Sequence, residues 1–349
     1  MKKHLLSLLL TALLVCSLVT PAVAASSGYS DVPADHWSAS DVMRATELGL
    51  FQGIGNGLFG RGQPITRAAF VTALVRLFGW ESVSPATASF ADVTSDRWYY
   101  EAVETACANG AFVATGRTFR PTDNITREEM AVMLIRSLGY ASLAGVVSEL
   151  GSPFTDVTTS RGYITMAYDA GIINGVGDGK FAPDGSATRE QAAAVLVRTY
   201  DRLHTAPRLT ESTVGYHTIS VSTPTVSLET PIPTTPLEPI AALYSALRQA
   251  RASGTDLSRS VLVLTAGGVR TVVANGRIAG CSVISAQEVE KILSRKEIHT
   301  YYNARYESAY VIYTPNSYQT VTLWYQSDES LAAKLQLAAL FGVGQYYLQ

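Results

Sequence analysis

The stretch TGRTFRPTDNITREEMAVMLIRSLGY, residues 115–140, sets a pattern that the chain uses three times. It returns as GIGNGLFGRGQPITRAAFVTALVRLFGW at residues 53–80 and as GVGDGKFAPDGSATREQAAAVLVRTY at residues 175–200. In each copy a phenylalanine precedes a Thr-Arg pair, and a second arginine follows. The shared positions are Phe59, Phe119 and Phe181; Thr66, Thr126 and Thr188; Arg67, Arg127 and Arg189; and Arg76, Arg136 and Arg198. This regular recurrence indicates three structural repeats.

Each copy also has a front half, at residues 29–50, 90–111 and 154–172. Apolar side chains three and four residues apart, closed by a glycine, predict an amphipathic helix with a C-terminal cap. The equivalent positions are Asp31, Asp92 and Asp156; Val42, Val103 and Ile164; Ala45, Ala106 and Ala167; and Gly49, Gly110 and Gly171. Each repeat is therefore predicted to be a helix, a glycine turn and a second helix.

The Thr-Arg pair marks the start of the second helix in each copy. In two copies the sequence predicts a capping box, in which the threonine hydroxyl accepts from the backbone three residues on and a Glu or Gln side chain returns to the threonine amide. The pairs are Thr126 with Glu129 and Thr188 with Gln191. The first copy has Ala69 at this place, so Thr66 is predicted to cap without the return bond.

Residues 55–60, GNGLFG, fit the G-x-G-x-x-G fingerprint of a dinucleotide site. That site needs a buried strand before the glycines and a helix directly after them. The sequence offers neither, and the third copy lacks the last glycine. The glycines are therefore predicted to supply turns with positive φ, not a nucleotide site.

The N-terminus predicts export. Residues 1–24 combine early lysines, an apolar run and small residues before a cleavage site after Ala24, as a secretory signal peptide does. Cys16 raises a lipoprotein alternative, but Val15 stands where a small residue normally precedes a lipidated cysteine. No later stretch approaches the roughly 18 uninterrupted apolar residues of a membrane span. The mature chain is therefore expected to be exported and free of membrane spans.

Charge and cysteine content narrow the possible partners. The formal net charge is −2, and removal of the two lysines within residues 1–24 lowers it to −4. A mildly acidic chain argues against nucleic acid as a general partner. Cys107 and Cys281 remain, which is too few for a disulfide framework or a metal cluster. Both are predicted to be buried free thiols.

The repeated pattern resembles the S-layer homology (SLH) domain. The resemblance rests on Phe/Tyr-x-Asp-Val, a tryptophan, Ala-x-x-x-Gly, a glycine turn, and Ile-Thr-Arg-Glu closing on Leu-x-Arg. Three tandem copies are predicted at residues 28–85, 88–145 and 152–204. The resemblance implies an all-α, pseudo-threefold triplet on the bacterial surface. It also implies noncovalent anchoring to the cell wall, through grooves that bind an anionic, pyruvylated secondary polysaccharide attached to peptidoglycan.

Three arginines are candidates for polymer binding. Arg67, Arg127 and Arg189 stand at the first position of a helix, beside backbone amides and the positive end of the helix dipole. A guanidinium fork suits a ketal carboxylate better than a point charge would. The alternative is a helix start with a solvated arginine. Their recurrence in register favours a functional groove.

Aspartates and tryptophans extend the candidate site. Within the family, Asp31, Asp92 and Asp156 border the groove, whereas their spacing favours capping of the front helix. Trp37 and Trp98 could stack on a sugar face, but aromatic residues at repeat positions favour the core. The copies also differ from one another: the third has Thr159 where tryptophan would align, with Tyr163 as a partial substitute, and the second has lost a turn glycine.

The composition changes after the repeats. Residues 205–237 are rich in Thr, Ser and Pro and are predicted to be an extended linker, within which residues 216–228 could add an edge strand. Residues 238–349 are predicted to be a small α+β domain. Its expected helices cover residues 239–253, 285–295 and 328–342, and its expected strands cover 260–268, 269–276, 298–306, 308–315 and 319–326. The first two strands are expected to form a hairpin.

The order of these elements resembles roadblock or longin-type domains, in which helices lie on the faces of one antiparallel sheet. The likeness is one of topology alone, and fold does not give function. The C-terminal domain shows no convincing triad, carboxylate pair or metal spacing, and the sequence indicates no cofactor. The chain is therefore predicted not to be an enzyme, and this domain to contact other surface proteins. The alternative is a wall-anchored enzyme that acts on wall glycan or polysaccharide.

Overall fold

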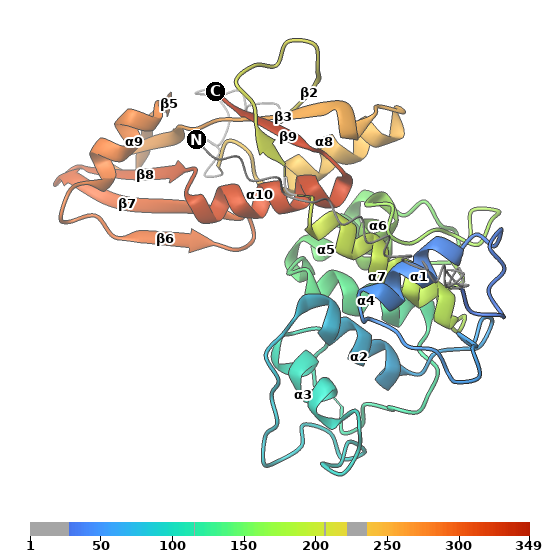
Figure 1. The fold of residues 1–349 in the computed structure, drawn as a ribbon. Helices are drawn as coiled ribbons and strands as arrows, with labels where there is room; N and C mark the ends of the chain where they lie inside the picture. Colours follow the sequence, from blue (N-terminus) through green and yellow to red (C-terminus); the bar gives the residue numbers. More distant parts are fainter. Residues whose placement is uncertain (1–27, 115, 206, 222–235) are drawn as a thin grey trace, which may run out of the picture.

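A computed structural model describes residues 28–349 apart from residues 115, 206 and 222–235. The predicted signal peptide, residues 1–24, and the middle of the predicted linker lie outside the described residues. Figure 1 shows a helical part built from the repeats and a C-terminal part with strands and helices. The chain is thus multidomain, with three repeats followed by a region of antiparallel sheet and helices.

Each repeat has one helix before its glycine turn and one after it. The pairs are α1 (Ala39–Glu47) with α2 (Arg67–Phe78), α3 (Tyr100–Ala108) with α4 (Arg127–Ser137), and α6 (Arg161–Asp169) with α7 (Arg189–Leu203). An additional helix, α5 (Ala141–Val147), and the 3₁₀ helix η1 (Ser148–Leu150) join the second repeat to the third. Phe59, Phe119 and Phe181 are at most 2% exposed, so each turn buries its phenylalanine in the core.

The segments before α2, α4 and α7 hydrogen-bond to one another in a closed ring. The Ile65 amide donates to the Ala187 carbonyl at 3.0 Å, the Ala187 amide to Ile125 at 2.9 Å, and the Ile125 amide to Ile65 at 2.9 Å. All three residues are buried. Because each repeat supplies one donor and one acceptor, the third repeat closes on the first and the three pack as one body.

Two strands of the C-terminal part come from the predicted linker. A four-stranded parallel sheet has the order β1-β9-β3-β2, formed by β1 (Arg208–Leu209), β9 (Gln345–Leu348), β3 (Ser260–Leu264) and β2 (His217–Ser220). Buried Val261 and Leu262 of β3 fit a central strand with helices beside it. The described parts of residues 205–237 are therefore partly built into a sheet, in which β2 covers an edge of β3 and β1 covers an edge of β9 that would otherwise be open.

The second sheet is antiparallel and has the order β5-β4-β8-β7-β6. Its strands are β4 (Gly268–Ala274), β5 (Arg277–Ile284), β6 (Thr300–Asn303), β7 (Ser308–Asn316) and β8 (Gln319–Tyr325). The predicted hairpin of residues 260–268 with 269–276 is wrong, since β3 and β4 belong to different sheets. The hairpin partner of β4 is β5, across a turn in which Asn275 and Gly276 both have positive φ.

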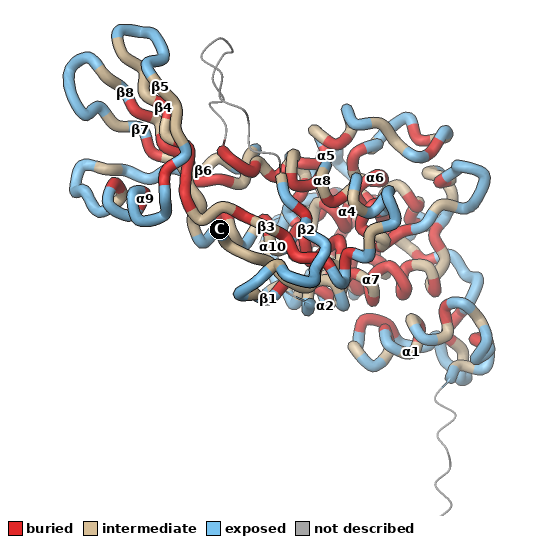
Figure 2. Tube along the Cα trace, turned by 90° about the horizontal axis from the view of Figure 1, so that it is seen from above, coloured by how far each residue is buried: buried red, intermediate tan, exposed pale blue. Residues whose placement is uncertain are grey.

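Helices α8 (Ile240–Ala252) and α10 (Asp328–Phe341) tie the C-terminal part to the third repeat. The other described helices of this part are η2 (Leu257–Arg259) and α9 (Ala286–Leu293). Tyr244 of α8 donates to the Asp169 carboxylate of α6 at 2.5 Å, and Arg248 pairs with the same carboxylate at 3.1 Å. Figure 2 shows buried residues running from the repeat helices into the parallel sheet, while the turns of the antiparallel sheet are exposed. One core therefore spans the junction.

Among the described helices, none has the length and apolar content needed to cross a membrane. Cys107 and Cys281 are free thiols, and both are half-buried where burial was predicted. In the same part of the chain, no three His, Cys, Asp or Glu side chains gather in a way that could hold a metal ion.

Candidate functional site

Each repeat aspartate holds the turn that follows it. Asp31 accepts from the amides of Phe59 at 2.8 Å, Gly60 at 2.7 Å and Arg61 at 2.8 Å. Asp92 does the same for Phe119 and Arg120 at 2.7 Å, and Asp156 for Phe181 and Ala182 at 2.8 Å. The prediction that these aspartates cap the front helix is therefore wrong, because their carboxylates are occupied by amides about 25 to 30 residues away.

The hydrogen bonds to these carboxylates also set their acidity. Burial raises the pKa of Asp31, but the three amide bonds together outweigh it and leave the pKa below its usual value. For Asp156 the Phe181 amide is the largest influence, and it lowers the pKa. Both carboxylates are thus kept ionised as acceptors at neutral pH.

The three arginines link one repeat to the next. Arg67 Nε donates to the Phe119 carbonyl at 2.8 Å, Arg127 Nε to Phe181 at 2.8 Å, and Arg189 Nε to Phe59 at 2.9 Å. Each guanidinium also lies over the ring of the phenylalanine it binds, 4.6 to 5.1 Å from the ring centre. Phe59 is therefore held on both sides, by Asp31 at its amide and by an arginine of another repeat at its carbonyl.

These arginines are not solvated helix starts. Arg67 is 8% exposed and Arg127 is 7% exposed. Burial lowers the pKa of all three guanidinium groups, which nevertheless stay charged at neutral pH. Each guanidinium is therefore a partly desolvated positive charge, which attracts a nearby anion more strongly than an arginine at the surface would.

The amides of the first helical turn are occupied, contrary to the sequence prediction. The Arg67 amide donates to the backbone carbonyl of Asp123 and the Ala68 amide to that of Pro121, while Thr66 Oγ1 accepts from the Ala69 amide. The start of α4 is bound in the same way by the loop before α7. These donors are therefore not free for an anion, and only the side chains of the arginines could face one.

The predicted caps lie at the helix starts. Thr126 and Thr188 form capping boxes with Glu129 and Gln191. Thr66 accepts from the amide three residues on, and Ala69 offers no return bond. Each cap borders the junction with another repeat, so the third residue of the helix also faces that junction.

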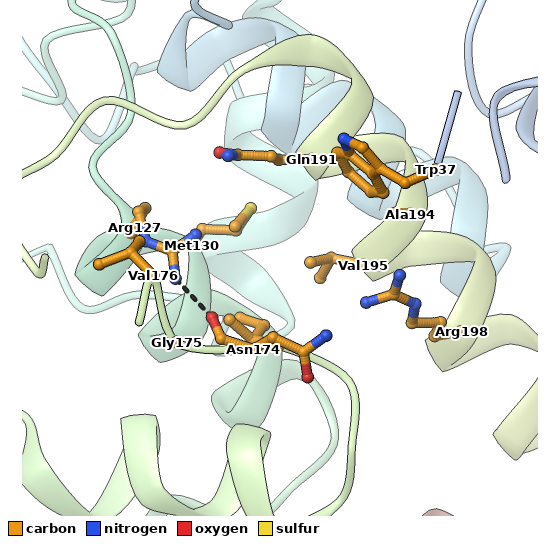
Figure 3. A pocket seen from close by; sticks show the side chains of 11 residues that line it. Trp37, Arg127, Met130, Asn174, Gly175, Val176, Gln191, Ala194, Val195 and Arg198 are labelled. Carbon is orange, nitrogen blue, oxygen red and sulfur yellow. Dashed lines mark hydrogen bonds between the residues drawn. The ribbon is translucent and has the colours of Figure 1, made fainter. Parts of the chain in front are cut away.

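One cavity lies where all three repeats meet, and we call it the Trp37 groove. It has a volume of about 300 Å³ and is lined by Trp37 of the first repeat, Arg127 of the second, and Asn174, Gln191, Val195 and Arg198 of the third. Figure 3 shows Arg127, Trp37 and Arg198 around this cavity, with Arg127 bound to the Asn174 carbonyl at 2.6 Å. Indole, amide and guanidinium groups thus surround one hollow.

A second cavity, the Trp98 groove, repeats this arrangement one repeat further on. Its volume is about 210 Å³, and its lining includes Trp98 of the second repeat, Arg189 of the third, and Gln52, Ala69, Thr72 and Arg76 of the first. Arg189 binds the Gln52 carbonyl at 2.9 Å, as Arg127 binds Asn174. The two grooves are therefore equivalent places in the cycle of repeats.

The tryptophans are exposed groove residues. Trp37 is 55% exposed and Trp98 is 68% exposed, so the prediction that both belong to the core is wrong. The core positions nearby are taken by Ser38, and by Tyr99 and Tyr100. Each indole therefore projects from its own repeat into a groove formed by the other two.

The junction around Arg67, which we call the Arg67 position, is built differently. Arg67 pairs with Glu129 at 2.6 Å, and Arg120 pairs with the same carboxylate. Thr159 stands in place of a tryptophan and donates to the Glu128 carboxylate at 2.9 Å. This junction therefore holds its own carboxylates beside the arginine.

Two groove arginines, Arg76 and Arg198, recur in the sequence, but the sequence pattern does not assign them to the site. Arg76 donates to the Leu50 carbonyl, and Arg198 donates to Ile172 and pairs with Asp41 at 3.3 Å. The recurrence of this arginine was the available signal. Gln52 and Asn174 act through their backbone carbonyls, for which sequence gives no signal.

The C-terminal part contains a buried ion pair. Lys334 of α10 lies 3.5 Å from Glu238, and both are at most 5% exposed. Glu238 accepts from the Thr265 amide at 2.8 Å, and Lys334 donates to Gln326 at 2.6 Å. Burial lowers the pKa of Lys334, although Glu238 opposes the effect. These contacts fasten α10 to the start of α8.

Comparison with known proteins finds surface proteins and enzymes. The S-layer protein sap of Bacillus anthracis is 29% identical over 206 residues, which are 58% of this chain and 25% of that protein. An endoglucanase of Bacillus sp. (strain KSM-635) is 30% identical over 237 residues, 64% of this chain and 24% of that protein. The chain spans about a quarter of the length of these relatives.

Among solved structures, a chitinase from Chromobacterium violaceum ATCC 12472 matches with a TM-score of 0.32 and 16% identity, over 38% of this chain and 39% of that one. A TM-score this low says nothing about the fold. The prediction that the chain is not an enzyme is nevertheless contradicted, because enzymes stand among its sequence relatives, the endoglucanase included. That prediction is withdrawn.

The family model of the S-layer homology domain matches residues 28–71, 89–131 and 153–193. The matched segments contain the aspartate and the arginine of every repeat, together with both groove tryptophans. The three matches follow the period of the sequence repeats and of the helix pairs. The chain therefore contains three S-layer homology domains.

Proposed function

We propose that the SLH repeats anchor this chain noncovalently to a bacterial cell wall by binding an anionic secondary polysaccharide in the Trp37 and Trp98 grooves. The observation that carries the proposal is the equivalence of these grooves, each of which combines an exposed indole with an arginine, buried Arg127 in one and half-buried Arg189 in the other. The S-layer proteins among the relatives support a location at the cell surface.

The chemistry of the grooves fits an acidic sugar. An indole presents an apolar face on which a pyranose ring can stack, and its N–H remains available for a hydrogen bond. A guanidinium at the other end of the cavity suits a carboxylate, such as that of a pyruvate ketal on an amino sugar. We propose that Trp37 and Trp98 select the ring, while Arg127 and Arg189 select the charge.

The arrangement of the repeats supports a single binding unit. We propose that they form a pseudo-threefold triplet, since the ring of Ile65, Ala187 and Ile125 places each repeat in the same relation to the next. In this proposal residues 1–24 direct export, and the C-terminal part sits directly on the third repeat. Asp31, Asp92 and Asp156 would then shape the grooves without touching the polymer.

A second function is proposed for the C-terminal part: it acts on wall glycan or another polysaccharide. The endoglucanase, which is 30% identical over 64% of this chain, supports this function. The full chain should be incubated with purified wall glycan, and released reducing ends should be measured. Because one core spans the junction with the third repeat, the test needs the whole chain. No release above that of a boiled sample would refute this activity.

Anchoring is tested by sedimentation with wall sacculi. The chain should sediment with sacculi that keep their secondary polymer and stay in solution with sacculi stripped by acid. Trp37→Ala combined with Trp98→Ala should abolish sedimentation without lowering the melting temperature, because both indoles are exposed. Tyr318→Ala, which removes an aromatic ring that is 74% exposed on the β7–β8 turn, is the matched control and should sediment normally. Equal sedimentation with both kinds of sacculi would refute anchoring.

A further inference from the structure

Building on the proposed anchoring function, we infer that the chain binds two acidic saccharide units, one in each tryptophan groove. The Arg67 position is closed to the polymer by Glu129, a carboxylate of the chain itself. Three differences between this position and the two grooves carry the inference.

The first difference is the partner of the arginine. Glu129 lies 2.6 Å from Arg67, and its other oxygen accepts from the Thr126 amide at 3.0 Å. Arg120 pairs with the same side chain. A ligand carboxylate would reach Arg67 by displacing Glu129, which would separate this partly buried carboxylate from one of its two cations. Glu129 thus takes the place that a ligand carboxylate would take.

The grooves have a neutral residue at the equivalent place. Ala69 lines the Trp98 groove and Gln191 lines the Trp37 groove. Within the described ranges, no carboxylate lies within ion-pair distance of Arg127 or Arg189. The Gln191 carbonyl accepts from the Thr188 amide at 3.2 Å, so its NH₂ group can donate to a ligand. Among the described residues, Arg127 and Arg189 therefore have no ion-pair partner, and Asp156 acts on Arg127, and Asp31 and Glu190 on Arg189, only at longer range.

The second difference is the local charge. The Arg67 position holds Glu128 as well as Glu129, and Thr159 donates to Glu128. The first repeat has Ala68 and Ala69 at these two places, and in the third repeat Glu190 accepts from the Gly62 amide at 2.9 Å. Asp123 also pairs with Arg120 at 3.6 Å, so this position holds three carboxylates against two arginines, and its net charge does not attract an anion.

The third difference is the stacking surface. Thr159 stands where the other junctions receive an indole, and Tyr163 lies near Arg136, which donates to its hydroxyl at 3.4 Å. A threonine offers no flat apolar face for a sugar ring. The Arg67 position therefore lacks both components that the grooves provide.

The number of bound units can be measured by equilibrium dialysis of the mature full chain. The probe is a radiolabelled methyl glycoside of a pyruvylated N-acetylhexosamine, which is too small to reach two grooves. The wild-type chain should bind two probes at saturation, and Trp37→Ala or Trp98→Ala alone should bind one. A wild-type count of one or three would overturn this inference and leave anchoring intact.

The role of Glu129 is tested by copying the Trp37 groove into the Arg67 position. Glu129→Gln with Thr159→Trp should raise the count from two to three. A variant that keeps the wild-type circular dichroism spectrum and still binds two probes would overturn the role given to Glu129. If the wild-type chain binds no probe and sediments equally with both kinds of sacculi, the anchoring function itself fails, and this inference fails with it.

Discussion

Replacement of Arg127 by alanine should unfold the chain more readily, because this side chain joins the second repeat to the third. It donates to the carbonyls of Phe181 at 2.8 Å and Asn174 at 2.6 Å, and its guanidinium lies 4.6 Å from the centre of the Phe181 ring. Hydrogen bonds to charged groups contribute about 1.5 to 3 kcal/mol each. The contact with the ring adds about 1 kcal/mol.

The net loss is smaller than the sum of these contributions. Removal of Arg127 also removes the penalty for burying its charge, which offsets part of the gain from its partners. We therefore expect the free energy of unfolding to fall by about 3 to 5 kcal/mol. Arg127→Lys keeps the charge but cannot reach both carbonyls with one planar fork, so its loss should be about half as large.

Urea unfolding of the full chain, followed by circular dichroism, measures this loss. The matched control is Arg97→Ala, which removes a guanidinium that is 60% exposed and lies 3.8 Å from Asp96. A surface pair of this kind contributes less than about 1 kcal/mol. If Arg127→Ala destabilises the chain no more than the control does, the arginine is not a structural link between repeats.

Three further changes test other contacts. Burial raises the pKa of Glu129, but its amide and arginine partners outweigh burial and leave the pKa below its usual value. Wild type should therefore exceed Glu129→Gln in unfolding free energy above about pH 4.5 and lose this advantage as the pH falls through the lower pKa of the folded state. Urea titrations at several pH values check this, and an advantage independent of pH would contradict it. Gly162→Ala should lower the free energy of unfolding by about 3 kcal/mol, because the new Cβ would lie 1.7 Å from a backbone oxygen of α5. Gly145→Ala is the control, since its new Cβ meets no atom within 4 Å. Equal melting temperatures for the two variants would contradict the close packing of α5 and α6. Tyr244→Phe should cost about 1 to 3 kcal/mol in urea unfolding, since Asp169 loses a buried donor, and an unchanged midpoint would show that this bond does not hold the C-terminal part to the third repeat.

The sequence was most informative where its pattern reports local structure. Helix periodicity predicted a front and a back helix in every repeat, and each back helix begins at the arginine of the Thr-Arg pair, because caps and amphipathic faces depend on neighbours three or four positions away. The same reasoning missed β5, although Asn275-Gly276 is a strong hairpin turn. It also paired two strands that are adjacent in the chain but belong to different sheets.

The candidate site depends on contacts between repeats, which periodicity does not report. Asp31 has the spacing of a helix cap, yet its carboxylate binds Phe59, 28 residues later. Trp37 has the character of a core residue within its own repeat, yet it lines a cavity formed with Arg127 of the next repeat. Position within the closed cycle, and not local pattern, decides what these side chains do.

The closed ring of Ile65, Ala187 and Ile125 has a mechanical consequence for the wall anchoring proposed above. A pull on the C-terminal part enters the third repeat, and from there Arg189 passes the load to the turn of the first repeat through the Phe59 carbonyl. The repeats therefore cannot peel away one at a time. Tension has to break several junctions between repeats together, so the closed ring resists mechanical unfolding better than three independent domains joined by flexible linkers would.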